Sequence, residues 1–508
     1  MKDIKQILSV MAIAIGCQQG SGAECAGDSI LSRMIEHDLP VTELSGLTWE
    51  NPVFKQWQWQ SSLSEVGVSY GHEKQSAAVN PQNGRGGHLW GFEADSYMKY
   101  KTSTLWGQAA YSNGRIREKS WCEAVDLDII YPYYPADERG GSMNVEEYSF
   151  AGGYGDHTDK WAWGATLGYD AGLYYRPVDP RPKDVTGKLE IAAGGAYTIG
   201  KYRVGLGLDF MKYKQSVSIS FVSEMGEDKI YHTTGMGTHY VRFAGTGATT
   251  YYNGYSYGAK ISMLPVSTNG LRATVGVSRL TFNAILSDLN KLPLCGAWHN
   301  SLQLQAGYVT AGWGVSAGWE IYKRHGHENV FGDASGNIYP QIGSTDTYAD
   351  NGYTANVEGA WQKYVSGKIN LHASASMVYN HRCEVYYEPG RQSIYNRAGG
   401  RIGAGFSAIL PHGWCVSASV GWEGIAPVNN DLIMRETQSS SSVPQLIEIE
   451  RTRHYFATLH SSSVSADAGI TRTVAGKYAV QLSGKFGYTT YSGASRQRTH
   501  HAAISFIF

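Results

Sequence analysis

Two short motifs contain the residue types of catalytic or metal-binding sites. The first, Gly314-Val315-Ser316-Ala317-Gly318, has the spacing of a nucleophile elbow, whose serine attacks a carbonyl carbon from a sharp strand-to-helix turn. Here the motif lies inside a run of alternating apolar and small residues, which predicts an uninterrupted strand. We therefore interpret Ser316 as a polar strand residue and predict that the protein is not an enzyme.

The second motif, His325-Gly326-His327-Glu328, brings two imidazoles and a carboxylate close together, and such groups can ligate a metal ion. Metal sites usually need three or four protein ligands, and the sequence confirms no third ligand here. We interpret this motif as the polar beginning of a long loop. We predict neither a metal site nor a cofactor.

The cysteines do not form a recognisable framework. Beyond residue 23 the chain contains Cys25, Cys122, Cys295, Cys383 and Cys415. An odd number without close pairs is typical of neither a zinc site nor a disulfide scaffold. Three of them (Cys122, Cys295 and Cys383) fall in predicted loops, so a single bridge among these three stays open.

Most of the chain is predicted to lie in strands that have one apolar face and one face of small or polar residues. Between Trp161 and Tyr175, apolar side chains occupy the odd positions, and small or polar ones occupy the even positions. This period of two places the two sets on opposite faces of a β-strand. The apolar face is too long and too aromatic for water, and the other is too polar for a core. We predict that the strand separates lipid from water.

The same alternation continues from residue 63 to the end of the chain, with short and long connections in strict succession. Long loops are expected at residues 113–146, 176–187, 214–250, 279–300, 324–351, 380–399 and 424–460. This is the pattern of periplasmic turns and extracellular loops in an outer-membrane barrel. We predict an all-β fold, a transmembrane antiparallel up-and-down β-barrel of about 18 strands (range about 16–18), with a periplasmic N-terminus.

Charged residues on the polar face are predicted to line the lumen. They are Glu93, Asp95, Asp170, Glu190, Asp209, Glu320, Glu358, Glu423 and Asp467, together with Lys99, Arg203, Lys260, Arg272, Arg401 and Lys485. Each of them can form part of an ion-paired wall that stiffens the barrel. Small residues between them leave space, and barrels of this width generally hold an aqueous lumen.

The N-terminus has the features of a signal peptide. Lys2 and Lys5 precede a short apolar run at residues 7–15, and Ser21-Gly22-Ala23 offers small residues for cleavage after Ala23. Lipidation at Cys17 is an alternative that stays open. The formal net charge of −1 gives no support for binding to nucleic acid. The expected parts are a signal peptide (1–23), an N-terminal periplasmic segment or plug (24–62) and the barrel (63–508).

Two segments outside the strands bear on whether the lumen is open. Residues 47–59 are apolar and rich in tryptophan, and they can plug the lumen from below. Within them, Asn51-Pro52-Val53 is similar to the Asn-Pro-Ala step in the N-terminal hatch of outer-membrane fatty-acid transporters, with valine in place of alanine. Residues 129–135 are rich in tyrosine and proline. They can contact a sugar, a peptide or a partner protein, or fold inward and narrow the pore.

The C-terminal residues resemble the signal that the barrel-assembly machinery recognises. Ile504, Phe506 and Phe508 alternate with small or polar residues, and Phe508 ends the chain. With the Asn51-Pro52 step and the Tyr- and Gly-rich hairpins, the whole chain resembles an uncharacterised family of Bacteroidota outer-membrane β-barrel proteins. The resemblance implies the cell outer membrane as location and a Gram-negative source.

Three functions follow from these observations. The leading one is a porin-like, passive or gated conduit for small solutes. The alternative is an occluded binding or scaffold barrel that partners a surface lipoprotein or a transporter, and an outer-membrane enzyme is third. A TonB-dependent receptor, with its plug domain and about 22 strands, would need a longer chain. Apart from these partners, we expect contact only with outer-membrane lipid and the assembly machinery.

Overall fold

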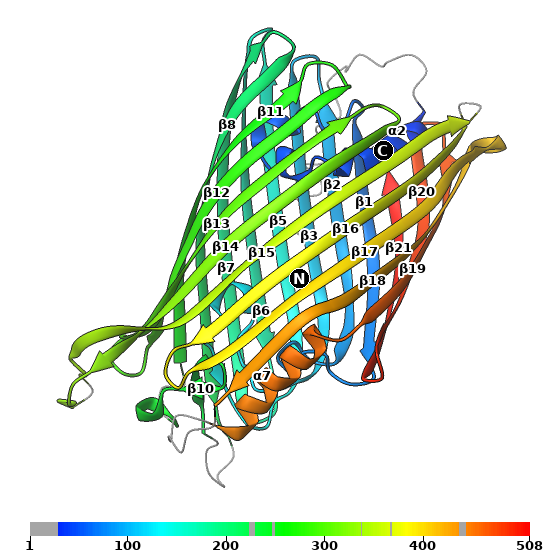
Figure 1. Cartoon of the computed structure of the whole chain (residues 1–508). Helices are drawn as coiled ribbons and strands as arrows, with labels where there is room; N and C mark the ends of the chain where they lie inside the picture. The colour runs from blue at the N-terminus through cyan, green and yellow to red at the C-terminus, as the bar shows by residue number, and fades with distance from the viewer. Residues whose placement is uncertain (1–28, 223–228, 246–248, 337, 366–367, 436–442) are drawn as a thin grey trace, which may run out of the picture.

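A computed structural model describes residues 29–222, 229–245, 249–336, 338–365, 368–435 and 443–508, and the predicted signal peptide lies outside them. Eighteen strands form one antiparallel sheet that curves into a barrel (Figure 1). They are β1 (Leu63–Gln75), β2 (Gly86–Lys99), β3 (Ser103–Lys119), β5 (Gly141–His157), β6 (Trp161–Tyr175), β7 (Arg181–Ile199), β8 (Tyr202–Ser220), β11 (Thr249–Pro265), β12 (Gly270–Leu286), β13 (Leu292–Val309), β14 (Trp313–Phe331), β15 (Gln341–Val365), β16 (Ile369–Tyr386), β17 (Arg391–Leu410), β18 (Trp414–Met434), β19 (Ser461–Val474), β20 (Tyr478–Tyr491) and β21 (Ser495–Ile507).

The barrel closes by pairing its first strand with its last. β1 pairs antiparallel with β2 on one side and with β21 on the other. At the seam, the backbone N–H groups of Ser64 and Phe508 each donate to the other residue's carbonyl oxygen at 2.9 Å. Closure leaves no unpaired sheet edge, which a wall surrounded by lipid requires. The predicted eighteen-stranded, antiparallel, all-β barrel is confirmed.

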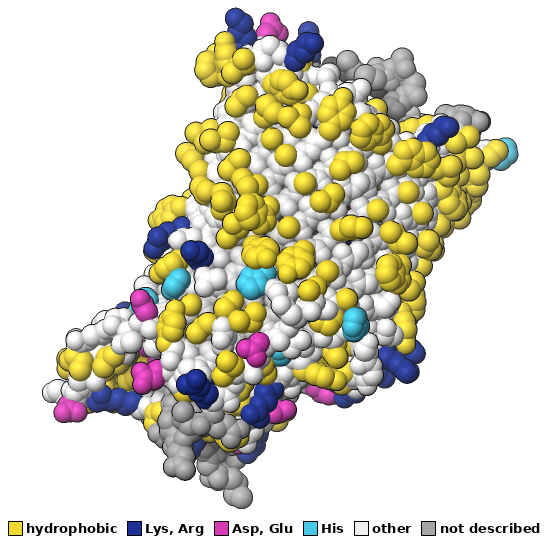
Figure 2. Space-filling model, in the orientation of Figure 1, with side chains coloured by type: hydrophobic (Ala, Val, Ile, Leu, Met, Phe, Trp, Pro, Cys, Tyr) yellow, Lys and Arg dark blue, Asp and Glu magenta, His cyan; other side chains and the backbone are white. Residues whose placement is uncertain are grey.

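The outer surface is the apolar face that the alternation predicts. In β6, the side chains of Trp163 and Leu167 are 52% and 55% exposed, whereas Ala162 between the outward residues is 7% exposed. Figure 2 shows hydrophobic side chains spread over the wall, with Lys, Arg, Asp and Glu gathered mainly toward its two ends. This distribution is that of a membrane-spanning barrel. None of the described helices is long and apolar enough to cross a membrane.

The strands are longer than the sequence pattern indicates, so each predicted long loop is too long. The clearest errors are residues 279–300, 324–351 and 380–399, which are mostly strand in β12–β17. A bilayer crossing takes about 9–11 strand residues, whereas β15 alone has 25. Where a strand projects beyond the lipid, the contrast between an apolar outer face and a polar inner face no longer holds. The alternation that identifies the strand is lost there.

The connections define two different ends. At the short-turn end, tight turns such as residues 200–201 join consecutive strands, as predicted, and both β1 and β21 have their terminal ends there. The other end, called here the long-loop end, carries the connections 120–140, 221–248 and 435–460. Each end of the lumen is filled by a different part of the chain.

At the short-turn end, the residues before β1 form four short helices. They are α2 (Ile30–His37), α3 (Pro40–Glu43), α4 (Gly46–Trp49) and α5 (Pro52–Lys55). The Asn51-Pro52 step starts α5, because the Asn51 side chain accepts a hydrogen bond from the Val53 N–H at 3.4 Å and proline suits the first helical position. The helices lie next to the strands at this end (Figure 1, blue). We call residues 30–62 the N-terminal segment.

Glycines in the wall let α5 lie flush against it. The buried Phe54 packs over Gly205, where an added Cβ would lie 2.9 Å from the phenylalanine ring. Asn51 covers Gly207, and the backbone of Pro52 covers Gly164. Any larger residue at these inward positions would push the helix away from the wall. The glycines therefore act as the seat of the N-terminal segment.

This packing predicts different effects for two glycines of the same strand. A Cβ at Gly164 would lie 2.5 Å from the Pro52 carbonyl oxygen, whereas one at Gly168 meets only ordinary contacts at 3.7 Å or more. We expect Gly164→Ala to destabilise docking of the N-terminal segment by about 1–3 kcal/mol, the usual cost of overpacking. Limited proteolysis should then cleave residues 30–62 at least tenfold faster than in Gly168→Ala. Equal cleavage rates in the two variants would contradict this seat.

Candidate functional site

The long-loop end is closed by loops that fold into the barrel. They contain α6 (Leu127–Ile130), β4 (Pro135–Ala136), β9 (Tyr231–Gly235), β10 (Thr238–His239), η3 (Val241–Phe243) and α7 (Pro444–Ala457), and β4, β9 and β10 form a small sheet. We call described residues 120–140, 229–245 and 443–460 the loop plug. Of the two alternatives for residues 129–135, the structure shows the inward one, since Tyr133 and Tyr134 are almost fully buried.

The loop plug packs on an apolar zone of the inner wall. Tyr133 lies over Gly326 of β14, where an added Cβ would be 2.4 Å from the tyrosine hydroxyl, and its ring meets Phe282 edge-on. Tyr213 and Tyr252 of neighbouring strands belong to the same buried cluster. Apolar side chains face inward here because protein, rather than water, occupies this end of the lumen. Burial of this cluster is the main force that keeps the plug in place.

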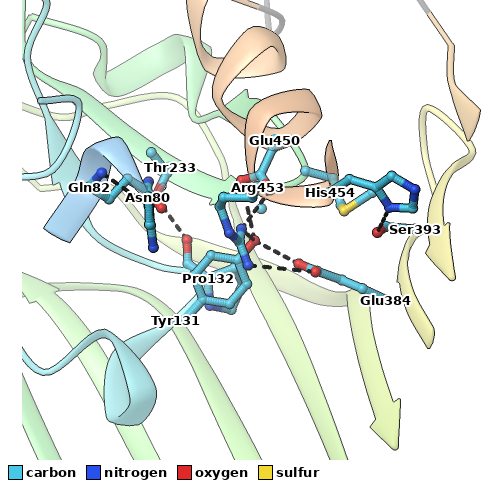
Figure 3. A network of polar contacts seen from close by, with 12 residues as sticks. Asn80, Gln82, Tyr131, Pro132, Thr233, Glu384, Ser393, Glu450, Arg453 and His454 are labelled. Atoms are coloured by element: carbon cyan, nitrogen blue, oxygen red, sulfur yellow. Dashed lines mark hydrogen bonds and ion pairs between the residues drawn. The ribbon is translucent and has the colours of Figure 1, made fainter. Parts of the chain in front are cut away.

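A buried network of charges joins helix α7 to the wall and to the connection 120–140, called here the aromatic loop (Figure 3). Arg453 of α7 donates to the Tyr131 hydroxyl at 2.6 Å and to Glu450 at 2.5 Å, and its guanidinium stands 4.6 Å from the centre of the Tyr131 ring. The Tyr131 hydroxyl donates in turn to Glu384 of β16 at 2.6 Å. Burial raises the pKa of Glu450, and the positive charge of Arg453 opposes that rise.

The network continues along the wall. Arg382 forms a two-pronged ion pair with Asp350 of β15, with its closest N–O distance 2.8 Å, and also pairs with Glu384 at 3.3 Å. Farther along α7, His454 and the Ser393 hydroxyl of β17 form a hydrogen bond at 2.9 Å. Buried ions need several partners to offset the loss of water. These contacts therefore fix the orientation of α7 against the wall.

A second group of charges fastens the beginning of the aromatic loop. Arg176 donates to Glu123 at 3.1 Å and to Asp137 at 2.6 Å, and all three side chains are at most 3% exposed. Burial, with the nearby Asp137, raises the pKa of Glu123 well above its ordinary value. Burial opposes ionisation of Asp137 as well, but a hydrogen bond from Glu123 and the charge of Arg176 lower its pKa. These opposite directions favour a neutral Glu123 beside an ionised Asp137. We call these three residues the latch.

Between the loop plug and the wall lies a polar cavity of about 800 Å³. The plug contributes Asp126, Asp128, Tyr131 and Arg453, the β1–β2 loop contributes Val79, Asn80, Gln82 and Asn83, and the wall contributes mainly His299, Tyr322, Arg324, Asp350, Asn380, Arg382, Tyr395, Arg397 and Tyr491. Its volume is that of a typical small-molecule site, and arginines, amides and aromatic rings face one space. This cavity is the candidate functional site.

None of the fifteen charged residues that the sequence analysis assigns to the lumen lines this cavity. Some interact with the N-terminal segment, namely Arg203 with Trp57, Lys260 with Glu50, Arg272 with Ser45, Asp95 with Lys55, Lys485 with Asp38, and Lys99 with Trp59. Others interact with neighbours on the same or an adjacent strand of the wall: Asp170 and Glu190 with Lys188, Asp209 with Lys260, Arg401 with Glu423, Glu93 with Ser69, Glu320 with Gln303, Glu358 with Asn356, and Asp467 with Ser419. They are spread around the barrel and form no single site.

The cavity residues escaped the sequence analysis because they lie in strand extensions that it assigned to loops. Arg324, Asp350, Arg382 and Arg397 all fall within the predicted loops 324–351 and 380–399. A weak signal was available, since Asn380, Arg382 and Glu384 keep a period of two beyond the lipid-facing part of β16. Charges at alternate positions after a membrane strand would have indicated an inward face.

The two motifs with catalytic or metal-binding residue types both lie inside strand β14. Ser316 is buried near the beginning of β14, opposite Gly307 and Glu358, with no strand-to-helix turn. The His325 motif also lies within β14, so its placement at the beginning of a loop is wrong. His325 stacks on Trp298, and Glu328 accepts hydrogen bonds from neighbouring hydroxyls. Among the described residues, no group of three His, Cys, Asp or Glu side chains could hold a metal ion.

The described cysteines form no disulfide bridge. Cys122, Cys295, Cys383 and Cys415 are all free, and Cys25 lies outside the described residues. Cys295 and Cys383 lie in β13 and β16, not in the predicted loops. Cys122 lies in the loop plug, and none of these three residues forms the bridge that the sequence analysis left open.

Comparison with known proteins places the chain in a family. The model of a family of unknown function, DUF6850, matches residues 52–508. The chain belongs to this family. The match begins at the proline that starts α5 and includes the whole barrel and the loop plug. No curated protein matches the sequence.

Several solved structures are similar to this chain at very low sequence identity. A mutant of the ferric enterobactin receptor of Pseudomonas aeruginosa is 8% identical, with a TM-score of 0.38 over 88% of this chain and 80% of the receptor. The ferric yersiniabactin uptake receptor of Yersinia pestis is 9% identical, with a TM-score of 0.40 over 89% of this chain and 81% of that receptor. The ferric preacinetobactin receptor of Acinetobacter baumannii is 9% identical, with a TM-score of 0.38 over 87% of this chain and 80% of that receptor. The likeness extends to the fold alone.

The latch predicts a stability window in pH for the aromatic loop. Because the pKa of Glu123 is raised, the stability that its neutral form contributes is lost as the pH rises through that pKa. Because the pKa of Asp137 is lowered, its contribution is lost as the pH falls through that value. Hydrogen exchange of residues 120–140 should therefore speed up on both sides of an intermediate pH range.

Two isosteric variants separate the roles of the carboxyl groups. Glu123→Gln keeps a donor toward Asp137, so it should change loop stability by less than about 1 kcal/mol and abolish the loss at high pH. Asp137→Asn leaves the buried Arg176 without its anion and should cost about 3–5 kcal/mol. The reverse order of effects, measured by the same hydrogen exchange, would show that the proton resides on Asp137.

Proposed function

We propose that this protein is a gated conduit for small polar solutes in the outer membrane of a Gram-negative bacterium. The observation that carries the proposal is the polar cavity of about 800 Å³ inside an eighteen-stranded barrel. A lumen of this strand number is wide enough for solutes. The N-terminal segment covers one end and the loop plug covers the other, so the conduit is gated rather than permanently open.

The same proposal includes the cellular context. Residues 1–23 act as the signal peptide, and the short-turn end with both termini faces the periplasm, as in single-chain bacterial barrels. The strand that ends at Phe508 is recognised by the barrel-assembly machinery, and outer-membrane lipid surrounds the wall. The Tyr- and Gly-rich hairpins support an origin in Bacteroidota. We assign no catalytic activity to the chain.

One observation favours the second candidate, an occluded binding or scaffold barrel that works with a surface lipoprotein or a transporter. The apolar cluster beneath the loop plug is extensive and includes fully buried Tyr133, Tyr213 and Tyr252. A core of this kind can hold the lumen closed permanently. The two candidates differ in whether the intact protein ever opens.

Single-channel recording separates these candidates. In planar bilayers, the full-length mature protein should be closed most of the time and open briefly. Arg453→Gln leaves Glu384 and Glu450 buried with less compensation, which typically costs about 3–5 kcal/mol, so the open fraction should rise at least a hundredfold with the same unit conductance. Arg451→Gln provides the matched control on the same helix, because Arg451 and its partner Glu448 are largely exposed and such pairs contribute little. Folded protein that never opens, with or without Arg453, would contradict the conduit.

Epitope tags test the orientation. Gly336 lies in an exposed connection at the long-loop end, and residues 158–160 form an exposed turn at the other end. We expect antibody to bind a tag at Gly336 on intact cells, and a tag at Asp159 only after the outer membrane has been permeabilised. Labelling at Asp159 on intact cells would show that the long loops face the periplasm.

A further inference from the structure

Of the four arginines around the cavity, Arg382 and Arg453 have compensating anions among the described residues, and Arg324 and Arg397 do not. Arg382 and Arg453 each pair with two carboxylates. Arg397 of β17 has no ion pair with any carboxylate among the described residues. Its only hydrogen bond there is a long one, 3.5 Å, from Nη2 to the side-chain oxygen of Asn380. A guanidinium that faces a polar cavity with so little compensation is an acceptor site for an anion.

The surroundings hold Arg397 in this position. Its Nε atom is buried and has no hydrogen-bond partner. The guanidinium lies 5.1 Å from the centre of the Tyr395 ring, and Asn380 is itself held by a hydrogen bond of 2.9 Å to Thr354. A buried donor without a partner is costly unless something else satisfies it. Arg397 lines the cavity, so the cavity is a space in which its guanidinium can meet a partner.

Two further groups on the same cavity wall contribute positive charge and a free ring nitrogen. Arg324 donates to the backbone carbonyl oxygens of Tyr131 at 3.1 Å and Asp128 at 2.5 Å, so its hydrogen bonds are satisfied while its charge is not neutralised by an ion pair with a described residue. His299 has a buried Nδ1 atom without a partner and stacks on Tyr322, with ring centres 5.3 Å apart. Arg324 interacts electrostatically with His299, so the two groups are near neighbours.

We propose that the cavity binds a small anion through Arg397, with a carboxylate or phosphate group as the part that the guanidinium recognises. The inference rests on the proposed function in taking this cavity as the solute site. Arg397 supplies the charge-assisted hydrogen bonds, and on the same side of the cavity Arg324 adds positive charge and His299 offers a ring nitrogen. The exposed Asp128 carboxylate and the amide of Asn80 on the other side accept and donate hydrogen bonds to the uncharged part of the solute.

Calorimetric titration of the purified, detergent-solubilised full chain tests this site without any need for transport. The probes are D-glucuronate for a carboxylate, D-glucose 6-phosphate for a phosphate, and D-glucose as the neutral analogue. We expect saturable binding of at least one anion to one site and no binding of glucose. Binding of D-glucuronate identifies a carboxylate as the recognised group, and binding of D-glucose 6-phosphate identifies a phosphate. Absence of binding by both anions at about 10 mM would overturn the proposal, even if the channel recordings succeed.

Variants on one strand provide the control. Arg397→Gln should weaken anion binding at least tenfold, since a charge-assisted pair is lost, and Arg397→Lys should retain part of the affinity. Arg401→Gln changes the next inward-facing arginine of β17, which pairs with Glu423 and does not line the cavity, so it should bind like the wild type. Heat-modifiable migration checks that each barrel is folded. Wild-type affinity in Arg397→Gln would assign the anion to another group. Should that variant fail to fold, Arg397→Lys decides the same point. A reduced affinity supports the assignment to Arg397, and wild-type affinity overturns it.

Discussion

Each backbone N–H and C=O group in the membrane-crossing wall must find its partner within the wall, because hydrocarbon offers none. The chain meets this requirement by pairing β1 with β21, down to the reciprocal bonds between Ser64 and Phe508. Closure with eighteen strands has a consequence for the interior, since side chains of the wall alone do not fill a barrel of that size. The remainder of the structure depends on how this space is occupied.

The two ends of the lumen are filled by different physical means. At the short-turn end, α5 fits against inward glycines such as Gly205 and Gly207, so shape complementarity of backbone and side chain determines the position of the segment. At the long-loop end, burial of apolar side chains supplies most of the stability, and buried ion pairs determine how the loop plug is oriented against the wall. Such pairs contribute little net stability but are costly to break. This combination gives the loop plug one preferred closed arrangement.

The sequence was sufficient for the wall and insufficient for what lies inside it. The period of two in stretches such as residues 161–175 depends on contact with lipid on one face, so the lipid-facing part of each strand was visible. Beyond the lipid that contrast disappears, and the strand ends that carry Asp350, Arg382 and Arg397 were interpreted as loops. The loop plug was invisible for a related reason, since residues such as Tyr131 and Arg453 meet only in the folded barrel. The apolar residues 47–59 and the tyrosines of 129–135 did indicate segments that could enter the lumen.

The central claim is that the cavity is part of a closed lumen that opens transiently. The rate at which a small neutral methanethiosulfonate reagent modifies Asn380→Cys, in a chain with Cys383→Ser, measures access to that cavity directly. Asn380 lines the cavity, and the matched variant Gly336→Cys gives the rate at an exposed connection. The account predicts that Asn380→Cys reacts at least a hundredfold more slowly than Gly336→Cys, and that Arg453→Gln removes most of this difference. Equal rates in the otherwise unaltered chain would show that the lumen is open and contradict the account.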